Sequence, residues 1–549
     1  MSSVTNKEPV RLGEQALSLE QVARVAQDDA PVTLSPAAQQ RVADCHAVVM
    51  QAMRNNQPVY GLTVGVGWNK DRSVFLTDES DPGAEQALLE HSRAHNHASL
   101  RAHAAGIGEP LSVPITRAAM LVRLNMMLTG ASGAQPAVVE QLAAFLNHGI
   151  TPLLPANGSL GMADLTQSAH IGLSLVGEWD VQVNGQTMSA QAAIAQAGLP
   201  DLRLIGKDFL ALASTNCITA GWLCLSVLAV TELLQRVELL AALAMEGMNA
   251  NLSPLLDTVT AARPETHMQA CAAALRSHLQ GSSLWQPDAQ RPLQDPLSFR
   301  NIAYVLGQLH KACQGAHEAL AMHINSSDDN PLVSLQAESC ASEVANSYCV
   351  RNAQGELLGA IYPSANFDGT SLVCAAQDVA LALARLSQTL TMQVVRTESP
   401  ALTGLTRYLA HPLNAHGHAF GALQKPMISL DQENQSLGKP VSLGNAVLGG
   451  NIEDLASHGM LATANIERML DNLYQMASLH LLHFAQAVDL RLLANPHRRL
   501  GSHTKDLLDA YRKHVALVTQ DRIFTADIAA GARFFRQWQP GLAASKVSA

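Results

Sequence analysis

Long apolar segments with helical spacing constrain this chain more strongly than any other feature of the sequence. Over residues 207–248 the apolar side chains recur at helical intervals, and the central part, residues 222–246, contains no glycine. Polar loops rich in Asn, Asp, Gly and Pro separate this segment from three comparable ones, at residues 298–322, 372–399 and 445–490. Because a single amphipathic helix cannot bury its apolar side alone, the pattern predicts a mainly α protein with a long central helical bundle.

The composition indicates that much of the helix surface is covered. Only 15% of the 549 residues are charged, well below the roughly 25% of an average soluble domain. Such surface must be hidden in a core or against other subunits, so we expect a homo-oligomer. The chain carries 36 Lys+Arg and 46 Asp+Glu, a net charge of −10. It therefore lacks a basic surface for binding phosphates, and we expect no nucleic-acid partner.

Cysteine usage and hydropathy indicate the compartment. The chain has no C-x-x-C pair, and its eight cysteines are Cys45, Cys217, Cys224, Cys271, Cys313, Cys340, Cys349 and Cys374. A chain of this size needs no disulfides, so we expect reduced thiols in a cytoplasmic protein. Residues 1–14 contain neither a secretory signal nor a transit pattern. The longest uncharged segment, residues 209–231, is interrupted by Ser, Thr and Asn, which favours a buried core helix over a membrane span.

The sequence predicts three blocks along the chain. Residues 1–200 form an N-terminal domain of shorter helices, and residues 201–494 hold the long helices of the bundle. Residues 495–549 are more charged and have shorter helical periods, so they predict a small helical cap. No internal repeat or low-complexity tract interrupts this order.

Local motifs taken alone do not identify an activity. The Gly-rich segment 60–67 fits neither the dinucleotide fingerprint nor the P-loop, so we expect no nucleotide. The histidine pairs His91/His95 and His416/His418 lack a third ligand at a recognisable spacing, so we expect no metal and no other cofactor. A Ser-His-Asp hydrolase would need a G-x-S-x-G elbow, and the sequence has none.

Several longer motifs, in the same order, resemble those of the histidine and aromatic amino-acid ammonia-lyases. They are PVYGLTVGVG (58–67), AHAAGIGEPL (102–111), the stretch 130–161, LQDPLSFRNIAYVLG (293–307), DDNPLV (328–333), ANFDG (365–369) and NIEDLASHG (451–459). The resemblance extends from Leu34 to the region of Arg533. It implies the ammonia-lyase/fumarase-like fold, a homotetramer whose sites combine residues of several subunits, and a small amino-acid-derived substrate.

One feature of that family is missing from this sequence. In the family, an Ala-Ser-Gly triad within G-S-x-G-A-S-G-D-L cyclises and dehydrates into a methylidene-imidazolone (MIO), the electrophile that captures the substrate amine. Here the matching segment, residues 158–165, reads GSLGMADL, which is one residue shorter and lacks that serine. Two family residues that assist MIO are also replaced, an asparagine by Ser214 and a tyrosine by Leu297. The resemblance therefore implies that MIO does not form at this segment.

Other site residues of the family are present at matching positions. By the resemblance, Tyr60 and Glu453 occupy catalytic positions, with Tyr60 as the base, and Arg300 grips the substrate carboxylate through a bidentate pair. Gln294, His103 and Phe367 match further substrate-binding positions. Ser214 and Leu297 are also assigned to substrate binding, at positions where they replace the family residue. Together, His103 and Glu453 resemble the histidine-using branch. Taken singly, each residue also has a structural interpretation, such as a surface tyrosine or an ion-paired arginine, and only their joint occurrence favours a site.

These residues predict an MIO-independent lyase-like enzyme. We expect Tyr60 and the Arg300 clamp to support elimination, isomerisation or cyclisation of an amino-acid-derived metabolite. A phenol acts as a base near neutral pH only if positive charge lowers its pKa, and Arg300 could supply some of that charge. The substrate would carry its own acidifying group or a better leaving group than ammonia. Two alternatives stay open: a conventional ammonia-lyase in which the triplet beginning at Gly158 cyclises, and a noncatalytic binding homologue.

Overall fold

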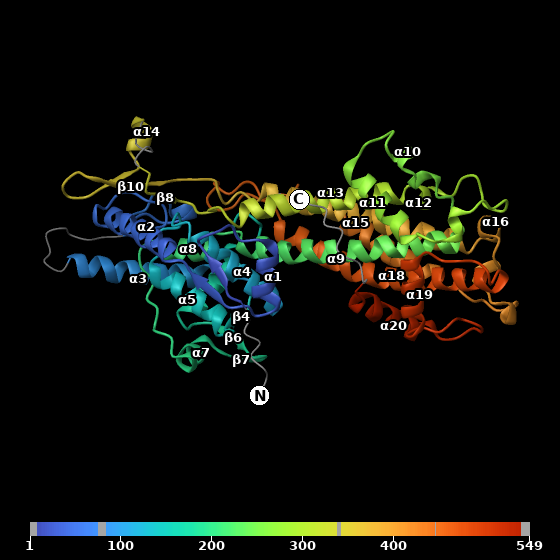
Figure 1. Ribbon diagram of the computed structural model, residues 1–549. Coiled ribbons are helices and arrows are strands. Elements are labelled where there is room, and N and C mark those ends of the chain that lie inside the picture. Colours follow the sequence, from blue (N-terminus) through green and yellow to red (C-terminus); the bar gives the residue numbers. More distant parts are fainter. Residues whose placement is uncertain (1–7, 75–83, 337–341, 445, 540–549) are drawn as a thin grey trace. The chain divides into compact units, whose positions relative to one another are not determined.

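The computed structural model describes residues 8–74, 84–336, 342–444 and 446–539 (Figure 1). Contacts between Cα atoms divide the chain into two compact units. Unit 1 consists of Met1–Leu228, Ala316–Ala376 and Pro440–Thr463, and unit 2 consists of Ala229–Gly315, Gln377–Lys439 and Ala464–Ala549. Each unit is therefore assembled from three stretches that are far apart in the sequence.

Unit 1 combines helices of medium length with small sheets. Its helices are α1 (Leu19–Gln27), α2 (Pro36–Arg54), α3 (Ala84–His103), α4 (Val113–Met127), α5 (Pro136–Asn147), α6 (Leu165–Leu175), α7 (Ala190–Ala197), α8 (Asp208–Ala213) and α14 (Glu343–Asn346). Its strands are β1 (Val10–Leu12), β2 (Val32–Leu34), β3 (Ile107–Pro110), β4 (Thr151–Pro152), β5 (Pro155–Asn157), β6 (Asp180–Val183), β7 (Gln186–Ser189), β8 (Leu332–Ser334), β9 (Cys349–Arg351) and β10 (Leu357–Tyr362). Strands β1 and β2 pair in parallel, whereas the sheets β8-β10-β9, β3-β5 and β4-β6-β7 are antiparallel. Among the described residues no sheet exceeds three strands, so helices form the main framework.

Helix α2 anchors the loop that follows it. The Ser35 side chain caps its N-terminus by accepting a hydrogen bond from a backbone N–H, and a proline occupies the first turn. Its buried side contributes Val49 to a core that also contains Val333 and Ile361 of the β8-β10-β9 sheet. The loop that carries Tyr60 comes directly after this helix and therefore starts from a fixed position.

A buried ion cluster joins α4 to the segment before β8. The Arg123 guanidinium lies 2.9 Å from Asp328 and 2.7 Å from Asp329, and all three side chains are 1% exposed. The Lys207 ammonium lies 3.8 Å from Asp329. Burial alone would raise the pKa of Asp329, but Arg123 and then Lys207 hold that pKa below its usual range. Burial lowers the pKa of Lys207 to about 8.

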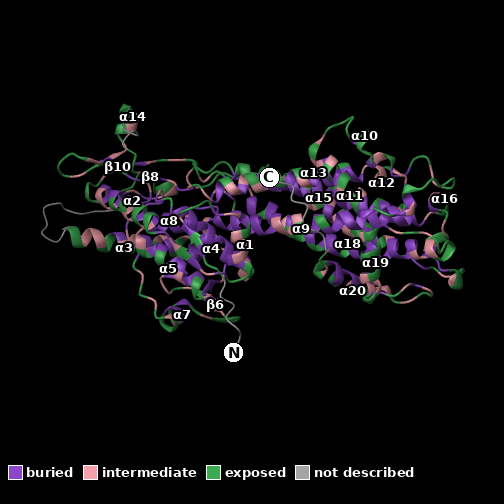
Figure 2. Cartoon of the chain, in the orientation of Figure 1, coloured by how far each residue is buried: buried purple, intermediate pink, exposed green. Residues whose placement is uncertain are grey.

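Unit 2 is a bundle of long helices, which confirms the predicted mainly α fold. Its helices are α10 (Asp257–Thr260), α11 (Thr266–His278), α12 (Leu297–Arg300), α16 (Pro400–Thr403), α17 (Gln424–Leu437), α19 (Ser502–Arg512) and α20 (Phe524–Gln537), with the greater parts of α9 (Cys217–Met248), α13 (Ile302–His323), α15 (Thr370–Thr397) and α18 (Gly459–Ala494). Polar contacts between buried residues link these helices. Gln393 of α15 pairs with His480 of α18 at 2.7 Å, and Asn472 of α18 donates to Asn434 of α17 at 3.0 Å. Figure 2 shows that buried residues run along the length of these helices.

The start of the last long helix differs from the prediction. The sequence pattern predicts helix from residue 445, which lies outside the described residues, but α18 begins only at Gly459. Residues 446–458 form a loop, in which Gly449 and Gly450 have φ angles of +55° and +69°. A right-handed helix excludes such angles, so the two glycines keep this segment out of the helix. The loop carries Glu453.

Two observations concern the predicted compartment. Six cysteines are free thiols, but Cys349 is disulfide-bonded, so the prediction of thiols throughout is wrong for this residue. Spacing along the chain cannot show which cysteines meet in space, and Cys340 lies outside the described residues. One described helical stretch, residues 208–248, is long and apolar enough to cross a membrane, but 78% of its most apolar window is buried within the structure. Burial of this kind is typical of a core helix.

Candidate active site

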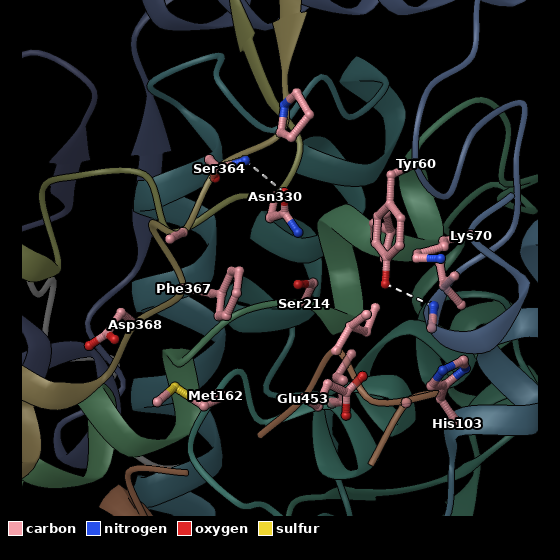
Figure 3. A pocket seen from close by; sticks show the side chains of 18 of the residues that line it. Tyr60, Lys70, His103, Met162, Ser214, Asn330, Ser364, Phe367, Asp368 and Glu453 are labelled. Carbon is pink, nitrogen blue, oxygen red and sulfur yellow. Dashed lines mark hydrogen bonds between the residues drawn. The ribbon is translucent and has the colours of Figure 1, made fainter. Parts of the chain in front are cut away.

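A cavity of about 800 Å³ lies in unit 1, and every residue that lines it belongs to this unit. Segments that are distant in the sequence converge on it (Figure 3). They are the Tyr60 loop, the end of α3, helix α8, the start of α6, the segment after β10 and the loop before α18. Such convergence around one concave space is the usual architecture of a small-molecule site.

Tyr60 points its phenol into this cavity (Figure 3). The Gly67 backbone N–H donates a hydrogen bond of 3.0 Å to the Tyr60 hydroxyl oxygen. Gly61, the next residue, has a φ of +67°, and a Cβ there would lie 2.2 Å from the Leu210 side chain. Only glycine satisfies both conditions, so the sequence fixes the direction of the Tyr60 ring through its neighbour.

The pKa of Tyr60 is raised above its usual range. Burial is the largest cause, the hydrogen bond from the Gly67 amide opposes it, and the negative charge of Glu453 raises the pKa further. Arg300, which the sequence analysis expected to lower this pKa, is not among the groups that shift it. The free protein therefore holds Tyr60 mainly as the neutral phenol.

His103, the last residue of α3, presents one ring nitrogen to a ligand. Its Nδ1 lies 2.8 Å from the Ser99 carbonyl oxygen, which can only accept, so Nδ1 carries a proton. The ring packs against Phe209 with centroids 4.9 Å apart. In the neutral imidazole this arrangement leaves Nε2 as a hydrogen-bond acceptor at the cavity.

The lining of the cavity is acidic. Asp368, Glu453 and Asp454 contribute three carboxyl groups, and Lys70 is the one lysine among the described lining residues, which include no arginine. Phe367 adds an aromatic face to the same wall (Figure 3). Excess negative charge and an aromatic face both attract a cation, so the cavity suits a positively charged ligand group.

The buried ion cluster also supports the cavity. The Asn216 side chain donates to the Phe367 carbonyl oxygen at 2.5 Å and accepts from the Ala163 N–H at 3.0 Å. The Asn216 backbone N–H donates to Asp328 at 2.7 Å, and Arg123 holds Asp328 from the other side. The positions of Phe367 and of segment 158–165 therefore depend on the cluster.

Segment 158–165 matches the place where the family carries its triad. Hydrogen bonds made by Ser159 and Asp164 hold this segment. The Ser159 hydroxyl donates to Asp164 at 2.7 Å and accepts from the Gly161 N–H at 2.9 Å. Asp164 also accepts from the backbone and hydroxyl of Thr219 at 2.9 and 3.0 Å. Burial raises the pKa of Asp164 to about 6 despite these bonds. Met162 lines the cavity from this segment (Figure 3).

Five of the eight residues predicted for the site line this one cavity: Tyr60, His103, Ser214, Phe367 and Glu453. The other three, Gln294, Leu297 and Arg300, belong to unit 2 and are not among its lining residues. The Arg300 guanidinium donates to the Gln294 side chain, and Leu297 is 60% exposed. Arg300 is therefore not among the residues that line this cavity, and its role as a carboxylate clamp stays a prediction.

The sequence analysis missed several lining residues, among them Lys70, Met162, Asn330, Asp368 and Asp454. Lys70 follows Tyr60 within the same loop, and Asp368 and Asp454 lie inside the motifs ANFDG and NIEDLASHG. The motifs that contain Asp368 and Asp454 could therefore be recognised in the sequence. Nothing in the spacing of those motifs indicates that the carboxyl groups face a common space, which depends on how the loops fold.

Comparison with known proteins agrees with this architecture. A histidine ammonia-lyase from Geobacillus thermodenitrificans is 31% identical over 525 residues, covering 95% of this chain and 96% of the relative. A histidine ammonia-lyase from Symbiobacterium thermophilum is 32% identical over 526 residues, with the same coverage.

Solved structures give the same result for the fold. The crystal structure of ergothionase from Treponema denticola, an ergothioneine-degrading enzyme in complex with desmethyl-ergothioneine sulfonic acid, matches with a TM-score of 0.86 and 32% identity, covering 96% of this chain and 99% of that one. Tyrosine aminomutase from Streptomyces globisporus matches with a TM-score of 0.81 and 27% identity, covering 96% and 97%. The family model of aromatic amino acid lyases matches residues 17–513. By this match and by these relatives, the chain belongs to the aromatic amino acid lyase family.

Proposed function

We propose that this protein is a carbon–nitrogen lyase that works without MIO. Its substrate would be a histidine-like betaine, an amino acid whose α-nitrogen is a quaternary trimethylammonium group, and its products would be trimethylamine and an α,β-unsaturated acid. The observation that carries the proposal is the acidic cavity around Tyr60. That cavity combines a base, an aromatic face and excess negative charge with a segment unable to form the family's electrophile.

The residues of segment 158–165 do not fit MIO. The group arises when the backbone nitrogen after a serine attacks a carbonyl and the serine loses its hydroxyl. The one serine of the segment, Ser159, is followed by Leu160, whose side chain crowds the attacking nitrogen, whereas the family has glycine there. The Ser159 hydroxyl is also engaged with Asp164 at 2.7 Å. Met162 has no hydroxyl to lose.

A quaternary substrate nitrogen explains why this electrophile is dispensable. MIO captures an amine through the lone pair on nitrogen, and a quaternary nitrogen has no lone pair. Such a nitrogen also carries no N–H proton, so it cannot neutralise the catalytic base by proton transfer. It keeps its positive charge at every pH and leaves as a neutral amine without prior activation.

The cavity offers partners for each part of such a substrate. The trimethylammonium group would lie against the Phe367 ring and near the carboxyl groups of Glu453 and Asp454. The imidazole N–H would donate to Nε2 of His103, the ring nitrogen that Ser99 leaves unoccupied. Lys70 is the cation that would pair with the substrate carboxylate within one chain.

Tyr60 would act as the base. In the proposed step its phenolate oxygen takes the β-proton, the C–H electron pair forms the double bond between Cα and Cβ, and the C–N pair leaves with trimethylamine. Charge balances, because one phenolate and one zwitterion give a neutral phenol, a carboxylate anion and a neutral amine. The pKa of Tyr60 is raised in the free protein, and the incoming substrate cation lowers it, which couples formation of the base to binding.

Similarity to known enzymes supports the substrate class. Ergothioneine is the trimethylammonium betaine of a thiolated histidine, and the enzyme named for degrading it shares this fold at 32% identity. The relatives named histidine ammonia-lyase support a histidine-like side chain. We also propose a cytoplasmic homotetramer in which residues 1–200 supply the base and the bundle of residues 201–494 supplies Arg300 to a neighbouring subunit.

The test compares three substrates under identical conditions: ergothioneine, Nα-trimethylhistidine and histidine. We expect trimethylamine and an ultraviolet-absorbing unsaturated acid from at least one betaine, and ammonia from histidine at a rate lower by about a thousandfold or more. The variant Tyr60→Phe should abolish turnover and solvent deuterium exchange at the β-carbon, while calorimetry still detects substrate binding. Exchange that persists in Y60F would remove Tyr60 from the role of base.

The intact mass of the denatured protein distinguishes the proposed MIO-independent reaction from that of a conventional ammonia-lyase. The names of the relatives favour the conventional reaction. Formation of MIO from any triplet removes two waters. A mass equal to that of the encoded chain supports the MIO-independent reaction. A deficit of two waters, together with ammonia release from histidine, would replace it. Betaine binding without any turnover would instead identify a noncatalytic homologue.

A further inference from the structure

We propose that unit 2 binds a zinc ion through Glu238, Cys271 and His310. These residues lie on three different helices, α9, α11 and α13, which Figure 1 shows side by side. Their ligand atoms, a carboxylate oxygen, a thiol sulfur and an imidazole nitrogen, all lie within 4.8 Å of one another. All three residues belong to unit 2, and none of them lines the cavity around Tyr60.

A close crossing of two helices brings the ligands together. Gly307 of α13 packs against the backbone of Met268 in α11 so tightly that a Cβ at Gly307 would lie 2.7 Å from the Met268 nitrogen. His310 and Cys271 each lie three residues further along their helices, about one turn. The absent side chain at Gly307 therefore allows the approach that places the imidazole beside the thiol.

Glu238 is a buried carboxylate that no lysine or arginine of the described residues neutralises. The residue is 8% exposed, and Cys271 is 1% exposed. Within the described ranges, no lysine or arginine lies within 4.0 Å of the Glu238 carboxylate, whose contacts are His310 Nε2 at 2.9 Å and a hydrogen bond from the Cys271 thiol. A buried carboxylate needs a compensating positive charge. His310 supplies that charge only in its protonated form, whereas a divalent cation between the three ligands would supply it with a neutral imidazole.

The chemistry of the three ligands selects the metal. Calcium and magnesium prefer shells made of oxygen alone, whereas zinc binds thiolate, imidazole and carboxylate together. In a tetrahedral zinc site with bonds of about 2.0–2.3 Å, ligand atoms are roughly 3.3–3.6 Å apart. The His310 nitrogen and the Glu238 oxygen, 2.9 Å apart, would therefore separate by about 0.4 Å, and the Cys271 sulfur, within 4.8 Å of both, would approach them by about 1.3 Å at most. Three protein ligands leave the fourth position to water, and the His310 side chain, 27% exposed, marks the route of entry.

Local spacing in the sequence could not indicate this site. The sequence analysis expected no metal because it considered histidine pairs that are close along the chain, whereas these ligands are separated by 271 − 238 = 33 and 310 − 271 = 39 residues. On binding, the thiol loses its proton to solvent and the zinc–sulfur bond forms without any redox change. The ion would then connect α9, α11 and α13 within unit 2.

The experiment uses the full-length protein, stripped of metal with a chelator under reducing conditions and then titrated with Co²⁺ as a spectroscopic substitute for Zn²⁺. We expect about one ion per chain to be retained after gel filtration, with a sulfur-to-cobalt charge-transfer band in the near ultraviolet that only a cysteine ligand produces. Zn²⁺ should displace the cobalt and bleach the band. The experiment requires no substrate, so its result is independent of the proposed lyase reaction.

Variants distinguish this site from adventitious binding. Cys271→Ser should lose the charge-transfer band, whereas Cys313→Ser, which alters another buried thiol of unit 2, should keep it. His310→Ala and Glu238→Gln should keep part of the band but bind Co²⁺ about tenfold or more weakly. These two variants test the proposal if C271S does not fold. A band that persists in C271S, or cobalt that washes off the wild-type protein without producing a band, would overturn the proposal.

Discussion

At the scale of single residues, Tyr60 is the group whose environment matters most for the proposed reaction. Its hydroxyl receives one hydrogen bond, from the Gly67 N–H, and its pKa is raised by burial and by the charge of Glu453. The same Glu453 charge attracts a cationic substrate. In the proposed reaction Glu453 therefore has two opposing effects, because it would strengthen binding of the cationic substrate and it makes the free phenol harder to ionise.

Replacing Glu453 by Gln should separate these two effects. Because the proposed base is the phenolate form of Tyr60, kcat/KM of the wild-type protein should rise with pH through the neutral and alkaline range. Removal of the negative charge lowers the pKa of Tyr60, so this rise should move to lower pH in E453Q. KM should increase by about tenfold, which corresponds to roughly 1.4 kcal/mol of lost attraction.

Asp454→Asn is the matched control for this prediction. Asp454 also lines the cavity, but it is not among the groups that shift the pKa of Tyr60. D454N should therefore weaken binding and leave the pH profile in place. Profiles that are identical in E453Q and in the wild-type protein would contradict the assignment of Glu453 as a modulator of the base.

At the scale of secondary-structure elements, the ion cluster around Arg123 connects α4 with the segment before β8 and the start of α9. Replacing Arg123 by Met should lower the free energy of unfolding by about 3–5 kcal/mol, because two buried carboxylates, Asp328 and Asp329, lose their main partner. Arg54→Met, which removes an exposed ion pair with Glu85 in the same unit, should change the free energy of unfolding by less than about 1 kcal/mol.

The loss of unfolding free energy in R123M should depend on pH, and its direction follows from the lowered pKa of Asp329. Asp329 has a lowered pKa in the folded protein, so its stabilising contribution is complete above the unfolded-state pKa and is lost as pH falls through the folded-state value. The deficit of R123M should therefore be largest near neutral pH and shrink in acid, where protonation neutralises the orphaned carboxyl groups. The measurement is urea unfolding followed by circular dichroism, once near neutral pH and once in acid. An equal deficit at both would contradict an electrostatic origin.

At the scale of the whole molecule, the predicted carboxylate clamp and the cavity belong to different units of the chain. Arg300 lies in unit 2 and is not a lining residue, and exposed apolar side chains such as Leu297, at 60%, and Leu455, at 64%, indicate surfaces that a partner subunit could cover. We expect Arg300 to serve the cavity of a neighbouring subunit.

Complementation between inactive variants tests this expectation. Tyr60→Phe and Arg300→Ala should each be inactive alone, but co-expression of the two chains should restore about a quarter of the sites if Tyr60 and Arg300 come from different subunits. Light scattering would establish the size of the mixed assembly. No recovery of activity from a confirmed mixed oligomer would mean that the two residues do not act together across subunits.

The mainly α fold, the family and five of the lining residues could be predicted from the sequence. Helical periodicity indicates that one face of a helix is buried. It can be recognised without knowing which elements pack against that face, as in α9 and α15. The motifs at residues 58–67 and 451–459 contain Tyr60 and Glu453, so these two lining residues could be located without knowledge of the fold. The pattern failed at residues 446–458, where apolar residues continue but Gly449 and Gly450 adopt left-handed angles.

Only the tertiary structure decided which charged groups share a space. Lys70, Asp368 and Asp454 give the cavity its acidic balance, and Glu238, Cys271 and His310 meet from three helices. Electrostatic energy depends on distances between atoms and on burial, and neither quantity is encoded by spacing along the chain. The sequence by itself thus determined the helical elements and the absence of an Ala-Ser-Gly triad from residues 158–165, whereas folding determined which charged groups line the cavity.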